Sequence, residues 1–319
     1  MDANRFAVWL ALVFLVARGP SSEAVAQTTS GGPSPLVGTW RLVSVERADG
    51  NQPLAPVPNP SGILIQDAAG HAIEIITQSG RPASLNPAEQ LTTYHAFWGT
   101  FTVDAARSTA TYLLAGDLNP GRKDQRLVRT FARTEAQLVL TETGGDGRTA
   151  MRTTWQRIPE LEALPEYQEA IVGFWQWTGA GLFNASGTNV REASRDPSVI
   201  VYTPTGHMAV LYLPPPGRKP FAAAAPTVEE ARAALQGSVS YFGTYIVQPK
   251  SRAVFHYQLG AVNPAAVGGS FMRNFEMEGA RVTLLFPPTM LNGEQVRNTL
   301  TLKRLSGLAE MWPTWRNQQ

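Results

Sequence analysis

The chain has 319 residues, a formal net charge of +2, 16% charged residues and no cysteine. The lack of cysteine excludes disulfides, a thiolate nucleophile, zinc ribbons and the lipid-modified cysteine of a bacterial lipoprotein. The charges are of mixed sign without basic blocks, so nucleic acid is not an expected partner, and the 28 glycines and 24 prolines favour short strands with many turns.

Residues 1–26 have the three parts of a secretory signal. Arg5 precedes an unbroken apolar run over residues 6–17, and Ala24-Val25-Ala26 places small residues at the positions that a signal peptidase inspects, with Gln27 as the new N-terminus. This run is too short to cross a bilayer of about 30 Å as a helix. We therefore predict a cleaved signal and a periplasmic or secreted protein, with an uncleaved membrane helix as the alternative. No later run reaches the roughly 20 apolar residues of a spanning helix, so no stable membrane insertion is expected after cleavage.

An internal repeat organises the rest of the chain. The strongest block pairs residues 98–103 with residues 242–247, and two earlier blocks match in the same order. Single residues that match downstream at a constant offset of 144 are Gly116, Asn119, Pro120, Arg129 and Phe131 with Gly260, Asn263, Pro264, Arg273 and Phe275. The repeat predicts two domains at 36–158 and 170–305, joined by a linker at 159–169 and followed by a tail at 306–319. We expect Trp312 and Trp315 of the tail to dock on a domain or at the junction, because exposed tryptophan is costly.

Each copy consists mainly of predicted strands. Leu138 and Leu140 alternate with Gln137 and Thr141, which is the two-residue period of a pleated strand with one wetter face. Turn sequences such as residues 67–70 separate the runs. A small sheet covers its apolar face most simply by closing on itself, which also removes exposed edges. The predicted fold class is therefore all-β, with two tandem closed antiparallel barrels.

One short helix per copy interrupts the strands. Residues 86–89 and 227–230 both supply a capping box, the first with proline at the first helical position. The apolar stripes that follow comprise Ala88, Leu91, His95 and Trp98 in the first copy, and Val228, Ala231, Leu235, Val239 and Phe242 in the second. Each helix is expected to lie against its barrel, either over the open mouth or on a flank.

Four segments carry a family resemblance: the opening residues 36–42, the Gly-His pairs, residues 241–245 and residues 254–273. Together they resemble the bacterial and fungal lipocalin-like domain family over nearly all of both copies. The resemblance implies a calycin-type barrel in which the first-strand tryptophan stacks on a basic residue of the last strand. It implies the pairing of Trp40 with Arg157, and of Trp175 with Lys303 or Arg304. The family's histidine is His256 in the second copy but Tyr112 in the first, so the second copy is the better home for a site.

Arg129 and Arg273 are the most informative polar residues, because each lies at the centre of an apolar face of its predicted strand. An arginine that points into a barrel keeps its charge and needs a hydrogen-bonding partner. One interpretation is an internal carboxylate or backbone carbonyls that hold the core together. The other is the carboxylate or carbonyl of a bound ligand.

His256 shares a strand face with Val254 and Gln258. It is a candidate for hydrogen bonding within the core, for donation to a ligand, or for proton transfer near neutral pH. The further candidates for the lumen or mouth of the second barrel are Tyr245, Asn263 and Trp175.

Motifs of common catalytic sites are absent from the sequence. It contains no Gly-x-Ser-x-Gly elbow, no His-Glu-x-x-His and no phosphate-binding loop, and its four histidines are scattered. We therefore expect no cofactor and no metal. The leading hypothesis is an exported protein that binds or carries a small hydrophobic molecule in a barrel cavity. Two alternatives stay open: a cyclase or isomerase acting on a hydrophobic substrate, which the family resemblance implies, and a non-enzymatic interaction module.

Overall fold

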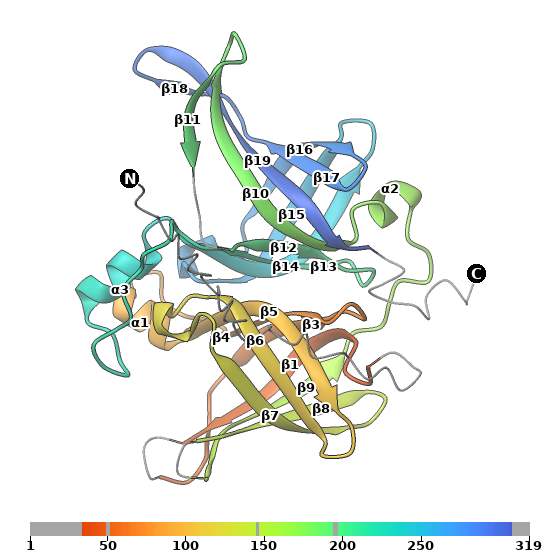
Figure 1. Ribbon diagram of the computed structural model, residues 1–319, viewed down its shortest axis with the longest axis vertical. Helices are drawn as coiled ribbons and strands as arrows, with labels where there is room; N and C mark the ends of the chain where they lie inside the picture. The colour runs from red at the N-terminus through yellow and green to blue at the C-terminus, as the bar shows by residue number, and fades with distance from the viewer. Residues whose placement is uncertain (1–33, 49–51, 145–146, 194–196, 308–319) are drawn as a thin grey trace, which may run out of the picture. The chain divides into compact units, whose positions relative to one another are not determined.

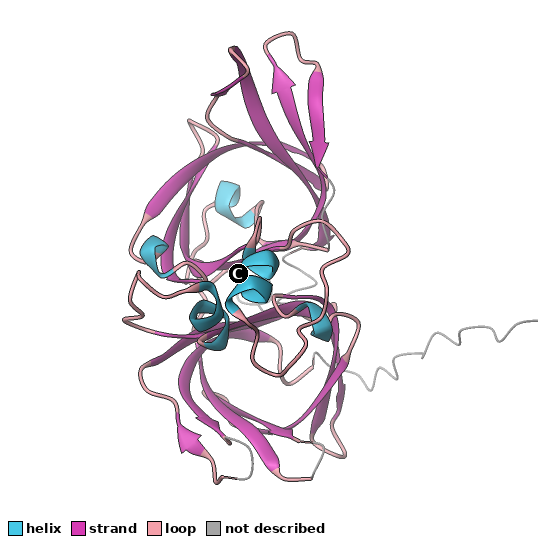
Figure 2. Ribbon diagram, turned by 90° about the vertical axis from the view of Figure 1, so that its left-hand side faces the viewer, coloured by secondary structure: helices cyan, strands magenta, loops and turns pink. Residues whose placement is uncertain are grey.

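The computed structural model describes residues 34–48, 52–144, 147–193 and 197–307. These residues form two barrels of antiparallel strands, one after the other along the chain, and each barrel is closed by pairing of its first and last strands. Figure 2 shows both barrels as closed rings of strands. The predicted all-β fold is confirmed. Within the described ranges no helix has the length and hydropathy needed to span a membrane. The predicted signal and the tail tryptophans lie outside these ranges.

Barrel 1 closes with eight strands, and β9 pairs back to β1. In spatial order these strands are β1 (Gly38–Arg47), β3 (Pro60–Gln66), β4 (His71–Gln78), β5 (Tyr94–Asp104), β6 (Thr109–Asp117), β7 (Arg126–Arg133), β8 (Gln137–Thr143) and β9 (Thr149–Arg157). The two-residue strand β2 (Ala55–Pro56) pairs only with β1. A short 3-10 helix, η1 (Pro120–Arg122), connects β6 to β7.

Barrel 2 repeats this order with eight closing strands, and β19 pairs back to β10. In spatial order they are β10 (Gly173–Asn184), β12 (Val199–Tyr202), β13 (His207–Tyr212), β14 (Val239–Gln248), β15 (Ala253–Ala261), β16 (Ser270–Glu278), β17 (Arg281–Leu285) and β19 (Glu294–Ser306). The shorter elements are β11 (Asn189–Ala193) beside β10, β18 (Thr289–Leu291) beside β19, and η2 (Pro264–Ala266) between β15 and β16. One helical turn, α2 (Glu166–Glu169), lies in the predicted linker.

A glycine at a bulge explains the strongest block of the repeat. β5 shifts register against β6 between Trp98 and Gly99, and β14 shifts against β15 between Phe242 and Gly243. A Cβ atom at Gly99 would lie 1.9 Å from the carbonyl oxygen of Leu113. Any larger residue would therefore push the two strands apart, so both copies keep glycine here.

Each first-strand tryptophan has the basic neighbour that the family resemblance implies. The guanidinium carbon of Arg157 lies 5.4 Å from the ring centre of Trp40, and that of Arg304 lies 4.3 Å from the ring centre of Trp175. Arg304, and not Lys303, is thus the partner in barrel 2. A Cβ atom at Gly38 would lie 3.3 Å from Cζ of Arg157. The glycine of the Gly-x-Trp opening therefore makes room for the stacked guanidinium.

Both helices begin at the predicted caps but end before the apolar stripes do. α1 (Pro87–Thr92) and α3 (Val228–Leu235) have complete capping boxes, at Asn86 and Thr227. The residues that extend the two stripes beyond the helices are His95 and Trp98 on β5, and Val239 and Phe242 on β14. Their prediction as helix residues was wrong, because a strand that is buried on both faces also places apolar residues three and four apart. The two helices contact each other (Figure 1), and each contributes to the apolar core between the barrels.

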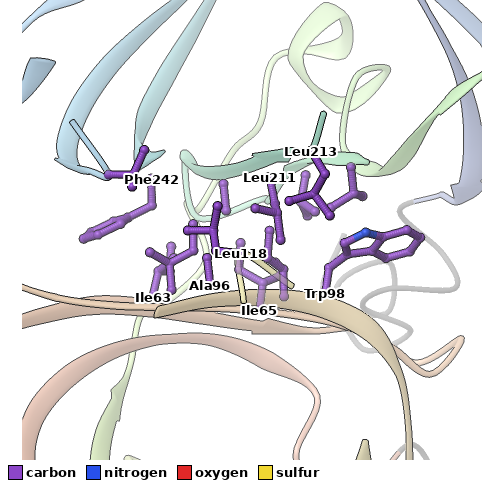
Figure 3. Packing of buried hydrophobic residues seen from close by; sticks show 14 of the residues in the cluster. Ile63, Ile65, Ala96, Trp98, Leu118, Leu211, Leu213 and Phe242 are labelled. Atoms are coloured by element: carbon purple, nitrogen blue, oxygen red, sulfur yellow. The ribbon is translucent and has the colours of Figure 1, made fainter. Parts of the chain in front are cut away.

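The outer faces of β3–β5 and β12–β14 pack together and form this core (Figure 3). Ile73 and Ile75 of β4 face the other barrel, whereas Ala72 and Ile76 of the same strand belong to the interior of barrel 1. These strands are buried on both faces, which is why they contain continuous apolar runs instead of strict alternation.

Each barrel donates hydrogen bonds from one arginine to backbone carbonyls of the other barrel. Arg81 of barrel 1 donates to the carbonyl oxygens of residues 261 and 262, at 3.1 Å for Val262. Arg218 of barrel 2 donates to the carbonyl oxygens of Asp117 and Leu118, at 2.9 and 3.1 Å. The two acceptor pairs are 144 residues apart, so each barrel presents the same strand end to the other barrel's arginine.

Candidate functional site

An ion-pair network crosses the interior of barrel 1. Arg129 on β7 is 2% exposed and donates Nη1 and Nη2 to the carboxylate of Glu74 on β4, at 2.5 and 3.0 Å. Its Nε and Nη2 also donate to Glu142 on β8, at 3.4 and 3.3 Å. Burial lowers the pKa of Arg129, but the charge and hydrogen bonds of Glu74, together with the charge of Glu142, outweigh burial and leave the pKa above its usual value. Of the two interpretations of Arg129, the structure supports the internal carboxylate.

The rest of the barrel 1 cavity is also charged. It measures about 260 Å³, and its further lining residues include Arg47, His95, Asp117 and Arg122. Burial raises the pKa of Asp117 to about 7 and lowers the pKa of His95 to about 3. An apolar ligand would have to desolvate these groups without compensating them, so barrel 1 is a poor site for a hydrophobic molecule.

Arg273 occupies the position of Arg129 in barrel 2, but neither carboxylate is retained there. Phe286 stands 144 residues after Glu142, as Arg273 does after Arg129. Val210 occupies the position in barrel 2 that Glu74 occupies in barrel 1. Glu74 pairs with Leu64 on β3, and Val210 pairs with Ile200 on β12. Each residue of the second pair comes 136 residues after its counterpart in the first. Two apolar residues thus replace the two counterions.

The guanidinium of Arg273 lies over two phenylalanine rings. Its Cζ lies 4.4 Å from the ring centre of Phe271 and 4.4 Å from that of Phe286. Its only hydrogen bond within the described residues runs from Nη1 to the carbonyl oxygen of Met272, at 2.9 Å. Burial lowers the pKa of Arg273, yet an arginine stays charged at any physiological pH. The cation therefore lines barrel 2 without the carboxylates that its counterpart has.

His256 is fixed by two tyrosines. Its Nε2 lies 2.9 Å from the hydroxyl oxygen of Tyr202, and its Nδ1 lies 2.9 Å from that of Tyr241. The ring is 1% exposed, and burial followed by the charge of Arg273 lowers its pKa to about 3. A neutral imidazole donates from one nitrogen and accepts at the other, so both tyrosine hydroxyls are satisfied. This geometry supports hydrogen bonding within the core and disfavours proton transfer near neutral pH.

These residues line one side of a cavity of about 240 Å³ inside barrel 2. Its walls are Trp177, Ile200, Tyr212, Val239, Tyr241, His256, Gln258, Phe271, Arg273, Leu284, Phe286, Asn298 and Leu300. Arg273 is the one charged side chain among these described lining residues. Oε1 of Gln258 is buried and has no hydrogen-bond partner in the described part of the chain. An eight-stranded barrel is wide enough to be filled by side chains or to hold one small ligand, and barrel 2 keeps space for the latter.

Three of the predicted site residues do not belong to these described cavity walls. Trp175 donates Nε1 to the carbonyl oxygen of Ile171 at 2.7 Å. Tyr245 donates its hydroxyl to the carbonyl oxygen of Thr203 at 2.9 Å. Asn263 is exposed and caps η2. The structure thus brings Arg273 and His256 together in one cavity, and it gives the other three residues hydrogen bonds that support the backbone.

The aromatic walls of the barrel 2 cavity and the acidic partners of Arg129 were not predicted from the sequence. Glu74 lies within the apolar run of β4, and a buried carboxylate in such a strand requires a counterion. Comparing Glu74 with Val210 in the second copy would have shown that this counterion is absent from the second copy. Phe286 follows the end of β17, where strand periodicity gives no orientation.

The closed barrels with an interior cavity define a ligand-binding type of domain. Residues 172–305, which form barrel 2, match the family model of the lipocalin-like domain, and barrel 1 has the same closed eight-stranded topology. A search of the curated proteins found no match. Among solved structures, the chain is similar to the uncharacterized protein YLR301w from Saccharomyces cerevisiae, with 11% identity, a TM-score of 0.43, and coverage of 84% of this chain and 97% of that one. It is also similar to a DUF3598 family protein of unknown function from Nostoc punctiforme, with 9% identity, a TM-score of 0.20, and coverage of 85% and 96%.

Proposed function

We propose that this protein is an exported carrier that binds a small hydrophobic molecule in the cavity of barrel 2. The observation that carries the proposal is the contrast between the two interiors. Glu74 and Glu142 neutralise the arginine of barrel 1 and line its cavity of about 260 Å³, whereas barrel 2 has aromatic rings beside its arginine and a cavity of about 240 Å³ with no carboxylate among its described walls. Apolar walls with a few polar groups are typical of sites for small molecules.

The cavity volume limits the size of the ligand. A water molecule takes about 30 Å³ of liquid volume, so the cavity corresponds to roughly eight waters. This supports a ligand with one aromatic ring or a short aliphatic chain. A long polyene would not fit without displacing side chains such as Leu284 and Leu300, which are 2% and 6% exposed.

Binding is favoured over catalysis by the state of His256. Both ring nitrogens are engaged by tyrosines, and the pKa of about 3 keeps the ring neutral. A general acid or base works best when its pKa lies near the operating pH. The cavity therefore offers shape and hydrogen bonds rather than a proton carrier.

The test is native mass spectrometry of the full chain purified from a periplasm. We expect a protein that begins at Gln27 and retains a small lipophile. The substitution Leu284→Phe fills the cavity and should remove the retained molecule. Its control is Leu140→Phe at the equivalent position of barrel 1, since Leu140 is 144 residues earlier and 1% exposed. Wild-type protein without any bound molecule, or equal retention by both variants, would contradict carriage in barrel 2.

A further inference from the structure

We propose that the ligand of barrel 2 is a small monocarboxylic acid whose carboxylate pairs with Arg273. This inference rests on the proposed function and adds the chemical class of the ligand. It follows from comparing the arginines at equivalent positions of the two barrels, Arg129, which is buried, and Arg273, which is partly exposed.

Barrel 1 shows how the protein neutralises an arginine at this position with its own carboxylates. Arg129 receives a bidentate contact from Glu74 at 2.5 and 3.0 Å and a second carboxylate from Glu142. A guanidinium presents a planar fork of N–H donors that matches a carboxylate, and an arginine cannot escape the cost of burial by losing its proton. The fold thus accommodates an inward arginine together with a carboxylate.

Barrel 2 keeps the arginine and loses both acids. Val210 and Phe286 stand in their places, so no carboxylate of the described chain lines this cavity. The neighbouring titratable groups do not act as anions. Burial raises the pKa of Tyr202 and of Tyr241 well above the usual value, so their hydroxyls stay protonated. The neutral His256 supplies no negative charge either. A ligand carboxylate is the group that completes the arrangement.

The stacking of Arg273 also favours an anion at its edge. The rings of Phe271 and Phe286 lie 4.4 Å from Cζ and cover the guanidinium. Only Nη1 donates to a protein acceptor among the described residues, the carbonyl oxygen of Met272. The remaining N–H groups point in the guanidinium plane, where a carboxylate binds in a bidentate way. The same rings give the apolar body of the ligand an aromatic wall.

Isothermal titration calorimetry of the full chain tests the inference with two matched pairs of probes. The pairs are hydrocinnamate with hydrocinnamyl alcohol, and heptanoate with heptanol. Each acid should bind wild-type protein at least about tenfold more tightly than its alcohol, as charge-assisted hydrogen bonds at a partly buried site imply. Arg273→Met should abolish this preference while the alcohols still bind, and Arg273→Lys should retain part of it.

Phe286→Glu is a second variant, which restores the acid of barrel 1 beside Arg273. It should weaken binding of the acids at least about tenfold, because the internal carboxylate competes for the guanidinium. Equal affinity of acid and alcohol for the wild type, or an acid preference that survives Arg273→Met, overturns the inference and leaves the proposed function standing. Failure of all four probes to bind the wild type counts against the proposed function itself.

Discussion

His256 makes barrel 2 sensitive to acid. Its pKa falls from 6.5 to about 3 on folding, because burial and Arg273 disfavour the charged ring. Between these two values the unfolded chain binds a proton that the folded chain does not. The contribution of His256 therefore leaves stability unchanged above about pH 6.5, and stability is lost as the pH falls from there toward 3.

We predict that giving barrel 2 the residues of barrel 1 at these positions removes this sensitivity. The triple substitution is Tyr202→Gln, Tyr241→Phe and His256→Tyr. It introduces the residues that barrel 1 has at the equivalent positions, Gln66, Phe97 and Tyr112. In barrel 1, Gln66 donates to Tyr112 at 3.1 Å. Between about pH 7 and about pH 5, the free energy of unfolding should fall by about 2 kcal/mol less in the variant than in the wild type. Urea denaturation followed by circular dichroism measures both. His95 is common to the two proteins and cancels, so parallel pH profiles would contradict the assignment to His256.

The inward orientation of Arg129 and Arg273 could be predicted from the sequence, because strand alternation fixes which residues share a face. Their partners could not. Glu74 is 55 residues from Arg129 and meets it across the barrel, and that contact depends on how the sheet closes. Local periodicity carries no information on closure.

At the scale of elements, the arginine on the last strand ties each barrel to its first tryptophan. Arg304 stacks on Trp175 and donates to the carbonyl oxygens of Ala170 and Val172, at 2.6 and 3.2 Å. Arg157 stacks on Trp40 at 5.4 Å, and its hydrogen bond to Val37 is 3.2 Å long. The contact is tighter in barrel 2.

We therefore predict that Arg304→Ala destabilises the protein by about 2 to 3 kcal/mol, since it removes a cation–π contact and two charge-assisted hydrogen bonds. Arg157→Ala should cost less. Thermal and urea unfolding of both variants check the order, with Arg304→Lys as the variant that keeps the charge but not the planar fork. An equal loss in the two alanine variants would show that the shorter distances in barrel 2 carry no extra stability.

The starts of the helices could be predicted from sequence and their ends could not. A capping box is a local signal, and both boxes form as expected at Asn86 and Thr227. The ends depend on tertiary contacts, because β5 and β14 are buried on both faces and imitate a helical stripe. The contact between the barrels could not be predicted either, because no turn or cap sequence marks it.

For the whole molecule, the contact between the barrels makes each one dependent on the other. Its core contains Ile63, Ile65, Ile73, Ile75 and Trp98 from barrel 1, all buried against barrel 2. We predict that residues 27–158 expressed alone do not remain monomeric, because this apolar face would be open to water. Light scattering after size-exclusion chromatography measures the mass. The variant Ile63→Lys/Ile75→Lys of the same fragment should shift it toward the monomer, and a monomeric unmodified fragment would contradict the prediction.

Arg81 and Arg218 each reach over to the same strand end of the opposite half. A contact in which both sides use the same patch is typical of a two-fold dimer, and the two barrels of this single chain contact each other in that way. Because both barrels lie in one chain, a substitution in one barrel leaves the sequence of the other unchanged. In a homodimer both subunits carry the same sequence, so both interiors would have the same residues; in this chain barrel 1 has Glu74 and Glu142 beside its arginine, and barrel 2 has Val210 and Phe286 beside its own.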